Sequence, residues 1–365
     1  MKRLKKGIIY LLVSLIIISM TGIGVTYFYR DQIISQFIVE ANKYINTPVH
    51  TERPVISFTE FPRVGIMFEN VYIEESYPDS KAPLAKLEKV LVAFNPFDLL
   101  MGEYTIDDVT LIKGKVNLKI NKEGIANYLV FQNRDSINSE VDLRLEKIRF
   151  IDIDIDFDNL RTQNQYMVSF QSIGSDLNIT NDQYRFTLVG NTLVNHIRIV
   201  NDKFLQNRQI ELDGRLLYDD FSKTLSFNES KVRIGSSTFD LDGSYAFKNS
   251  TVDVNIGAEK ANIQTLFSLF PDRLVSSFQK YESSGLIYFN GTIKGEVSKN
   301  ASPAFNFNIG SKDASVYHPQ YKAKLEGLNF QATVDVPSIE DLRKARLSIQ
   351  NFQAKLKGKE ISGSL

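Results

Sequence analysis

Residues 151–158 read IDIDIDFD, an unbroken alternation of apolar residues with aspartates. Successive side chains of a β-strand point to opposite faces, so this period of two predicts a strand with one apolar face and one acidic face. The aspartates would lie about 6.6–6.8 Å apart along the strand. Calcium is normally held by a loop that wraps oxygen ligands around it, so we interpret the aspartates as a solvated face rather than as a metal site.

The same alternation recurs along most of the chain. It is read near residues 64–75, 87–94, 116–121, 141–145, 165–180, 183–191, 208–218, 223–234, 250–258, 303–309, 321–335 and 343–358. Turn signals at short intervals favour antiparallel neighbours, and roughly 18–20 strands are expected. Helical patterns are scarce, with short segments expected only within residues 95–100 and 262–278. We therefore expect a mainly β chain that forms an elongated, curved antiparallel sheet.

Three of the expected strands carry glycine in the middle of an apolar face. Gly214, Gly243 and Gly291 each continue the parity of the apolar residues around them. A glycine there either leaves a dent that another group can approach, or marks a bulge or bend in a curving sheet. An apolar face that few helices can cover is typical of a binding groove. The alternative is a conventional sandwich, in which a second sheet covers the first. By parity, the candidate lining residues are Ile153, Ile155, Phe157, Leu212, Leu216, Phe239, Leu241, Tyr245, Phe247, Ile287, Phe289 and Ile293.

The N-terminus has the pattern of a membrane anchor. Gly7–Tyr29 contains no charged residue, and about 20 such residues span a bilayer as a helix. Four cations at positions 2, 3, 5 and 6 precede it, and positive charge stays on the cytoplasmic side. We expect a single-pass helix with a cytoplasmic N-terminus; the alternative is a cleaved signal peptide.

A second helix is expected immediately after the anchor. In Asp31–Asn46 the apolar residues form one helical stripe, and Thr47-Pro48 ends it. We interpret this segment as a stalk helix that packs on the first strands. The alternative is a helix that lies on the membrane surface.

Composition excludes several classes of function. The chain has 43 basic and 43 acidic residues, so no basic field is available for nucleic acid. It has no cysteine, and His50, His196 and His318 stand in no metal-ligand spacing. No phosphate loop, nucleophile elbow or zinc-protease motif occurs. We expect no enzyme, no cofactor and no metal.

One region resembles a known family. Leu87–Phe131 reads LEKVLVAFNPFDLLMGEYTIDDVTLIKGKVNLKINKEGIANYLVF, and it is similar to the N-terminal region of the AsmA-like family of bacterial envelope proteins. Residues 56–73 (ISFTEFPRVGIMFENVYI), 266–274 (LFSLFPDRL) and 283–297 (SSGLIYFNGTIKGEV) extend the likeness. The positions that match in the first region are Val90, Val92, Phe94, Pro96, Leu99, Gly102, Ile106, Val109, Leu111, Val116, Leu118, Gly124 and Asn127.

The resemblance implies a periplasmic β-groove that is anchored in the inner membrane and related to bridge-like lipid-transfer proteins. It implies phospholipid transfer or outer-membrane lipid homeostasis, with acyl chains, the inner membrane and outer-membrane assembly or lipid-transport proteins as partners. The alternative is an assembly factor for outer-membrane proteins, which would bind nascent strands at its sheet edges. Members of the family are usually longer, so the resemblance implies that the chain is either a fragment or a truncated member. The expected segments are residues 1–29 (basic tip and anchor), 30–48 (stalk helix), 49–135 (AsmA-like β region) and 136–365 (β-groove).

Overall fold

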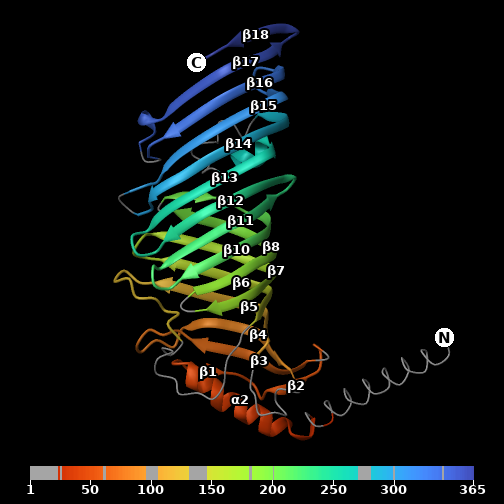
Figure 1. The fold of residues 1–365 in the computed structure, drawn as a ribbon, viewed down its shortest axis with the longest axis vertical. Coiled ribbons are helices and arrows are strands. Elements are labelled where there is room, and N and C mark those ends of the chain that lie inside the picture. Colours follow the sequence, from red (N-terminus) through yellow and green to blue (C-terminus); the bar gives the residue numbers. More distant parts are fainter. Residues whose placement is uncertain are drawn as a thin grey trace, which may run out of the picture. The chain divides into compact units, whose positions relative to one another are not determined.

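The structure is a computed structural model that describes residues 24, 27–60, 63–95, 106–130, 146–180, 183–199, 201–269, 281–298, 301–338 and 341–365. Within these residues the chain is mainly β and builds a large, curved, unclosed antiparallel sheet (Figure 1). Most of the expected anchor, the strand near 141–145, the turn after Asn95 and the second half of 262–278 lie outside the described residues. No helix in the described part has the length and apolar character needed to cross a bilayer.

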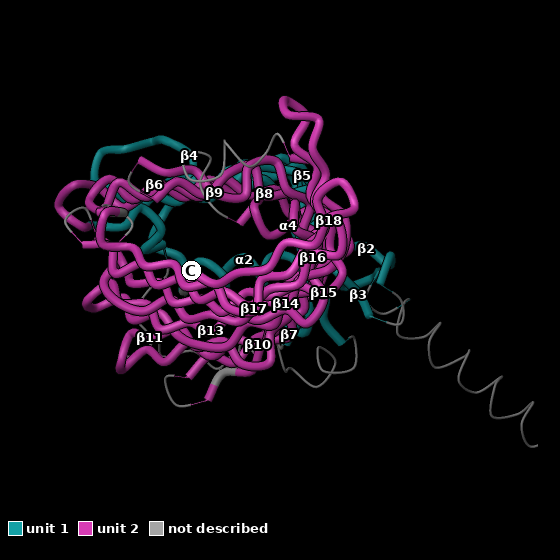
Figure 2. Tube along the Cα trace, turned by 90° about the horizontal axis from the view of Figure 1, so that it is seen from above, with its two compact units in different colours: residues 1–119, 125–154 teal, residues 120–124, 155–365 magenta. Residues whose placement is uncertain are grey.

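The chain divides into two compact units, coloured separately in Figure 2. Unit 1 comprises residues 1–119 and 125–154, and unit 2 comprises residues 120–124 and 155–365. Strand β6 (Lys147–Asn159) begins in unit 1, and its last residues belong to unit 2.

Unit 1 packs one helix against a short antiparallel sheet. Its elements are α2 (Arg30–Tyr44), β1 (Val49–His50), β2 (Val55–Ser57), β3 (Val64–Glu74), β4 (Pro83–Phe94) and β5 (Asp108–Ile120). Strand β3 pairs with β1, β2 and β4, and β4 pairs with β5. The apolar stripe of α2, including Ile33, Ile34 and Phe37, packs against a buried cluster that contains Val64 and Ile66. The expected stalk helix is therefore confirmed as a helix that packs on the first strands.

A buried asparagine fixes the loop that follows β5. Asn127 is fully buried, and its Nδ2 donates to Glu75 Oε2 at 2.9 Å and to the Asn117 carbonyl at 3.0 Å. Its Oδ1 accepts a hydrogen bond from the Lys119 amide at 2.7 Å. Buried polar groups cost free energy unless they are paired, so this asparagine ties the loop to the sheet because its amide is satisfied there.

Unit 2 is an antiparallel meander. Its strands are β7 (Asn164–Thr180), β8 (Gln183–Ile199), β9 (Asp202–Phe204), β10 (Arg208–Asp219), β11 (Thr224–Ile234), β12 (Ser237–Ala246), β13 (Thr251–Asn262), β14 (Glu282–Glu296), β15 (Ala304–His318), β16 (Ala323–Val336), β17 (Arg346–Leu356) and β18 (Lys359–Gly363). Each pairs with the next along the chain, except that β8 pairs with both β9 and β10. The short helix α4 (Ile263–Phe267) follows β13, and a 3-10 turn, η2 (Leu342–Lys344), precedes β17.

Bulges interrupt the pairing of most strands in unit 2. Register shifts occur between Phe227 and Ser230 in the β11–β12 ladder and between Ser311 and Ala314 in the β15–β16 ladder. Glu229 and Asp313, which lie inside these shifts, have φ of 49° and 53°. A bulge bends its strand and increases the local twist, so repeated bulges help to curve the sheet of unit 2.

Candidate functional site

The concave face of the unit 2 sheet, hereafter the trough, encloses a cavity of about 1240 Å³. Val, Ile, Leu and Phe side chains from β7, β8 and β10–β16 form most of its wall. Ligand pockets generally measure roughly 300–1,000 Å³, so this cavity is large for a small-molecule site. Figure 2 shows the strands of unit 2 curving around the space that this face surrounds.

The register of neighbouring strands makes the apolar wall continuous. Leu212 pairs with Val232, which pairs with Phe239 on the next strand. Farther along, Leu241 pairs with Ile256. Directly opposed residues share a face of the sheet, so each strand adds its apolar side chains to the same wall.

Apart from Thr192, which is buried in the middle of β8 and donates to the Ser169 carbonyl, the polar residues of the wall lie at the two rims of the sheet, where the strands turn. Gln163, Asn201 and Asp202 lie at the rim that contains the β8–β9 turn, here rim 1. Ser298 and Ser302 lie between β14 and β15 at the opposite rim, here rim 2. None of the described lining residues is lysine, arginine, histidine or tyrosine. The site can therefore exclude water from an apolar guest, and it presents no set of acid, base and nucleophile.

The structure places five of the sequence-predicted lining residues in the cavity wall: Leu212, Phe239, Leu241, Phe289 and Ile293. Phe239 and Phe289 are only 1% and 3% exposed, so they form the packed floor of the cavity.

The other predicted residues lie elsewhere. Ile287 is buried in a cluster with Ile263 and Leu266, so packing beside helix α4 takes it out of the wall. Leu216, Tyr245 and Phe247 have the parity of the trough face but lie nearer rim 2, outside the cavity. Ile153 is fully buried in unit 1. Ile155 and Phe157 also lie outside the wall, and the Phe157 ring contacts the Tyr166 ring, with centroids 5.6 Å apart.

Sequence reasoning missed many of the lining residues, and two regions show why. Phe305 and Phe307 on β15 were inside a recognised alternating run, so parity could have identified them. Val194 and Ile197 on β8 both line the cavity although they are three residues apart, which would put them on opposite faces of a regular strand. A register shift between them restores the common face. Met167 pairs with His196, whereas the next residue, Val168, pairs with Val194, so β8 has one extra residue there.

The glycine in the middle of β14 is covered by the protein itself. Gly291 pairs with Phe307, and a Cβ built on Gly291 would lie 1.8 Å from Phe307 Cδ1. The Phe307 ring therefore lies over Gly291, where it also stacks on Phe289 with centroids 5.0 Å apart. The parity through Gly291 is unbroken as expected, but Phe307 fills the dent that the sequence suggested.

Gly214 and Gly243 behave differently. The β8 ladder runs unbroken through Gly214, whereas the β11 ladder shifts between Asp213 and Arg215. A Cβ on Gly243 would lie 2.2 Å from the Asp253 carbonyl oxygen, so backbone approaches this position too closely for a side chain. The close group at Gly243 is thus the backbone of β13, and the extra residue of the shift beside Gly214 lies in β11, because Asp213 and Arg215 pair with Lys231 and Asn228.

Tyrosines collect near the rims of the trough. Tyr184, Tyr218 and Tyr245 are each one residue from a strand end at rim 2, and Tyr166 lies near the start of β7 at rim 1. The rings of Tyr184 and Tyr218 have centroids 6.0 Å apart, and the Tyr245 ring meets Phe247 edge to face at 5.0 Å. Burial, and secondly the phenol of Tyr245, raise the pKa of Tyr166 to about 12. Tyrosine suits a boundary that is apolar on one side and wet on the other.

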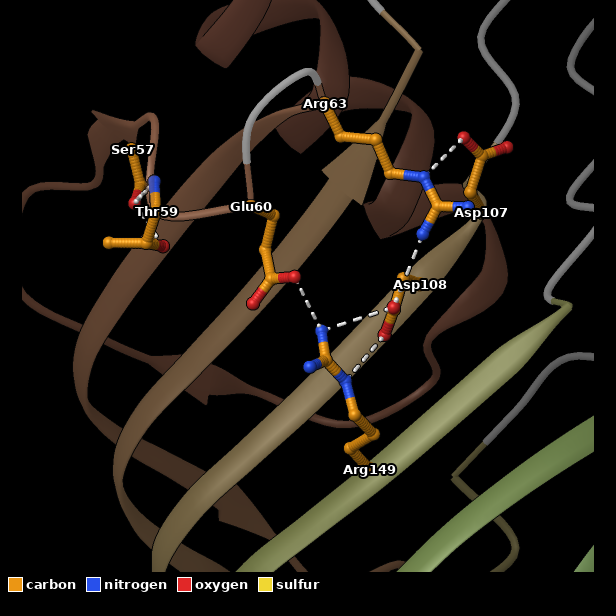
Figure 3. Close-up of polar contacts among 7 residues, drawn as sticks. All are labelled: Ser57, Thr59, Glu60, Arg63, Asp107, Asp108 and Arg149. Atoms are coloured by element: carbon orange, nitrogen blue, oxygen red, sulfur yellow. Dashed lines mark hydrogen bonds and ion pairs between the residues drawn. The ribbon is translucent and has the colours of Figure 1, made fainter.

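A charged cluster in unit 1 is the other conspicuous polar site (Figure 3). Arg149 Nη2 contacts Glu60 Oε2 at 2.9 Å and Asp108 Oδ2 at 3.1 Å, and Arg63 Nη1 contacts Asp108 at 3.4 Å. Burial lowers the pKa of Arg149, but bonding to Glu60 and the charge of Asp108 outweigh it, so the net shift is upward. These carboxylates are engaged by guanidinium groups, so we assign the cluster to the stability of unit 1.

Comparisons with protein-family models, with curated proteins and with solved structures find no match to this chain. Among the described residues, no group of three or more His, Cys, Asp or Glu side chains could hold a metal ion.

Proposed function

We propose that the chain is a non-enzymatic protein of the bacterial envelope, anchored in the inner membrane, that holds phospholipid acyl chains in its trough for lipid transfer or lipid homeostasis. The observation that carries the proposal is the apolar cavity of about 1240 Å³ on the concave face of unit 2. Each methylene group that leaves water for such a wall contributes about 0.8 kcal/mol, so an acyl chain is a favourable guest.

The distribution of polar groups supports an amphiphilic guest over a wholly apolar one. Serine hydroxyl, amide and carboxylate side chains stand at the rims, whereas the floor is Val, Ile, Leu and Phe together with the buried Thr192. Tyrosine side chains also lie near the rims, and tyrosine is common at boundaries between hydrocarbon and water. A phospholipid would place its chains against the floor and its polar group at a rim.

Photo-crosslinking in the full-length chain tests the proposal. A photoreactive amino acid at Ile293, which lines the cavity, is compared with one at the neighbouring exposed position Thr292, which faces the other side of β14. We expect a lipid adduct from position 293 and little from position 292. Equal adducts, or none at either position, would count against a lipid in the trough.

The assembly-factor alternative makes a different prediction for the edge of the sheet. In the described structure β18 pairs with β17 on one side only, and it carries Lys359 and Glu360, charges that are common on exposed edges. Adducts with outer-membrane proteins from β18, without lipid adducts in the trough, would favour that alternative.

A further inference from the structure

Three consecutive aromatic residues precede helix α2, and all three are exposed. The side chains of Tyr27, Phe28 and Tyr29 are 61%, 82% and 48% exposed. Residues 27 and 28 are helical, and Tyr29 leads directly into α2. The Phe28 and Tyr29 rings touch edge to face, with centroids 5.4 Å apart, and bury little of each other.

The spacing of the three rings argues against a protein partner. Consecutive residues of a helix point about 100° apart, so three in a row spread widely around the axis instead of forming one face. A helix that docks on a protein presents its anchors at spacings of three and four. An aromatic girdle spread in this way suits an environment that meets several sides of the chain, and the boundary of a bilayer is such an environment.

Basic groups lie beside this girdle. The Arg30 guanidinium lies over the Tyr27 ring, 4.9 Å from its centroid. Arg53 reaches the same place from the loop between β1 and β2, because its Nη2 lies 3.5 Å from Asp31 Oδ1. Two cations against the single carboxylate of Asp31 leave the patch with a positive charge, which favours anionic lipid headgroups.

The apolar pattern of the sequence changes at the same point. From Ile33 onward, the apolar residues of α2 lie on one face and pack on the sheet of unit 1. Before Tyr27, the sequence is apolar without any such periodicity. A helix apolar all round suits lipid, and one apolar on a single stripe suits a protein surface.

We infer that Tyr27, Phe28, Tyr29, Arg30 and Arg53 form the surface on which unit 1 meets an anionic bilayer, with the membrane boundary at residues 27–30. The inference rests on the membrane location in the proposed function but is independent of what the trough carries. It places α2 outside the hydrocarbon and unit 1 directly against the headgroups.

The absence of tryptophan from the chain allows a direct test, because one introduced indole is the only one. The full-length F28W variant is reconstituted into vesicles of phosphatidylcholine and phosphatidylglycerol whose acyl chains are brominated near the headgroup or near the chain end. The matched control is F221W in the β10–β11 turn, where the phenylalanine is 94% exposed. We expect headgroup-proximal bromine to quench F28W several-fold more than F221W.

Equal quenching of the two variants would overturn the inference, because the girdle would then lie in water. Stronger quenching of F28W by bromine near the chain end would also overturn it, because residue 28 would then lie in the hydrocarbon core. Lipid crosslinking at Ile293 is read separately. If no lipid crosslinks at position 293 but F28W is still quenched, the proposed cargo is refuted and the membrane-contact surface is supported.

Discussion

Replacing Gly291 by alanine should narrow the trough from within. The new Cβ would lie 1.8 Å from Phe307 Cδ1 and 2.9 Å from the Asn306 carbonyl oxygen, so the ring must move. Phe307 is only 4% exposed and stacks on Phe289, and the open space beside it is the cavity. Overpacking of this kind costs about 1–3 kcal/mol, of which the lost aromatic pair accounts for about 0.5–1.5 kcal/mol. We expect a lower free energy of unfolding and less bound lipid per protein.

The matched control is Gly310→Ala on the opposite face of the sheet. There a Cβ would lie 2.0 Å from Tyr288 Cζ, but that tyrosine is 36% exposed and can turn into solvent. Chemical denaturation gives the change in free energy of unfolding, and mass spectrometry of extracted lipid gives the loading. The reasoning is refuted if Gly291→Ala retains wild-type loading, or if both variants lose lipid equally.

Further predictions concern the floor of the trough, the loop of unit 1 and the rim. Leu241→Asp should abolish lipid loading at little cost in stability, because Leu241 borders the open cavity. Phe239→Ala should instead lower the free energy of unfolding by about 3–5 kcal/mol, because its ring is only 1% exposed. Chemical denaturation and lipid analysis of both variants check these expectations. Asn127→Ala should cost about 2–4 kcal/mol in denaturation experiments, because the Lys119 amide loses its acceptor and the Glu75 carboxylate loses one of its donors while it keeps the Ser80 hydroxyl. A change below 1 kcal/mol would contradict the role given to this residue, since one net hydrogen bond is worth about that much. The free energy of unfolding should fall by about 2–3 kcal/mol as the pH rises from 10 to 12, because the unfolded chain releases the Tyr166 proton near pH 10 while the folded chain holds it to about pH 12. Tyr166→Phe should remove that part of the slope, and an unchanged slope would show that the phenol is not buried as described.

The positions of the strands could be predicted because alternation is local. The runs at 208–218 and 223–234 coincide with β10 and β11 within a residue, and the stripe in 31–46 marks α2. The bulges could not be predicted, because Glu229 gives no signal for positive φ, and the enrichment of aspartate at positive φ does not single out Asp313 among the many aspartates of the chain. Beyond a bulge, the residues that alternation assigns to one face of the sheet lie on the other face. An assignment of faces from the sequence is therefore correct for only part of such a strand.

The trough lining was predictable only where a strand borders the cavity without interruption. Phe289 and Ile293 lie in the long β14 strand and were placed correctly by parity. Ile287 has the same parity, but its neighbours come from α4, and that tertiary contact has no local signature. Burial of Ile153 in unit 1 is likewise set by the division of the chain into two units.

The extra residue at Glu229 has a further consequence. Phe227 pairs with Gly243 and Ser230 with Leu241, so two residues of β11 stand opposite Asp242 alone. Deleting one codon there would restore regular pairing and leave the same side chains facing inward, while the strand would straighten. The bend of this wall therefore depends on how many residues β11 contains and not on which residues they are. Inserting or deleting a single codon would change the curvature of the sheet without changing the side chains that line the cavity.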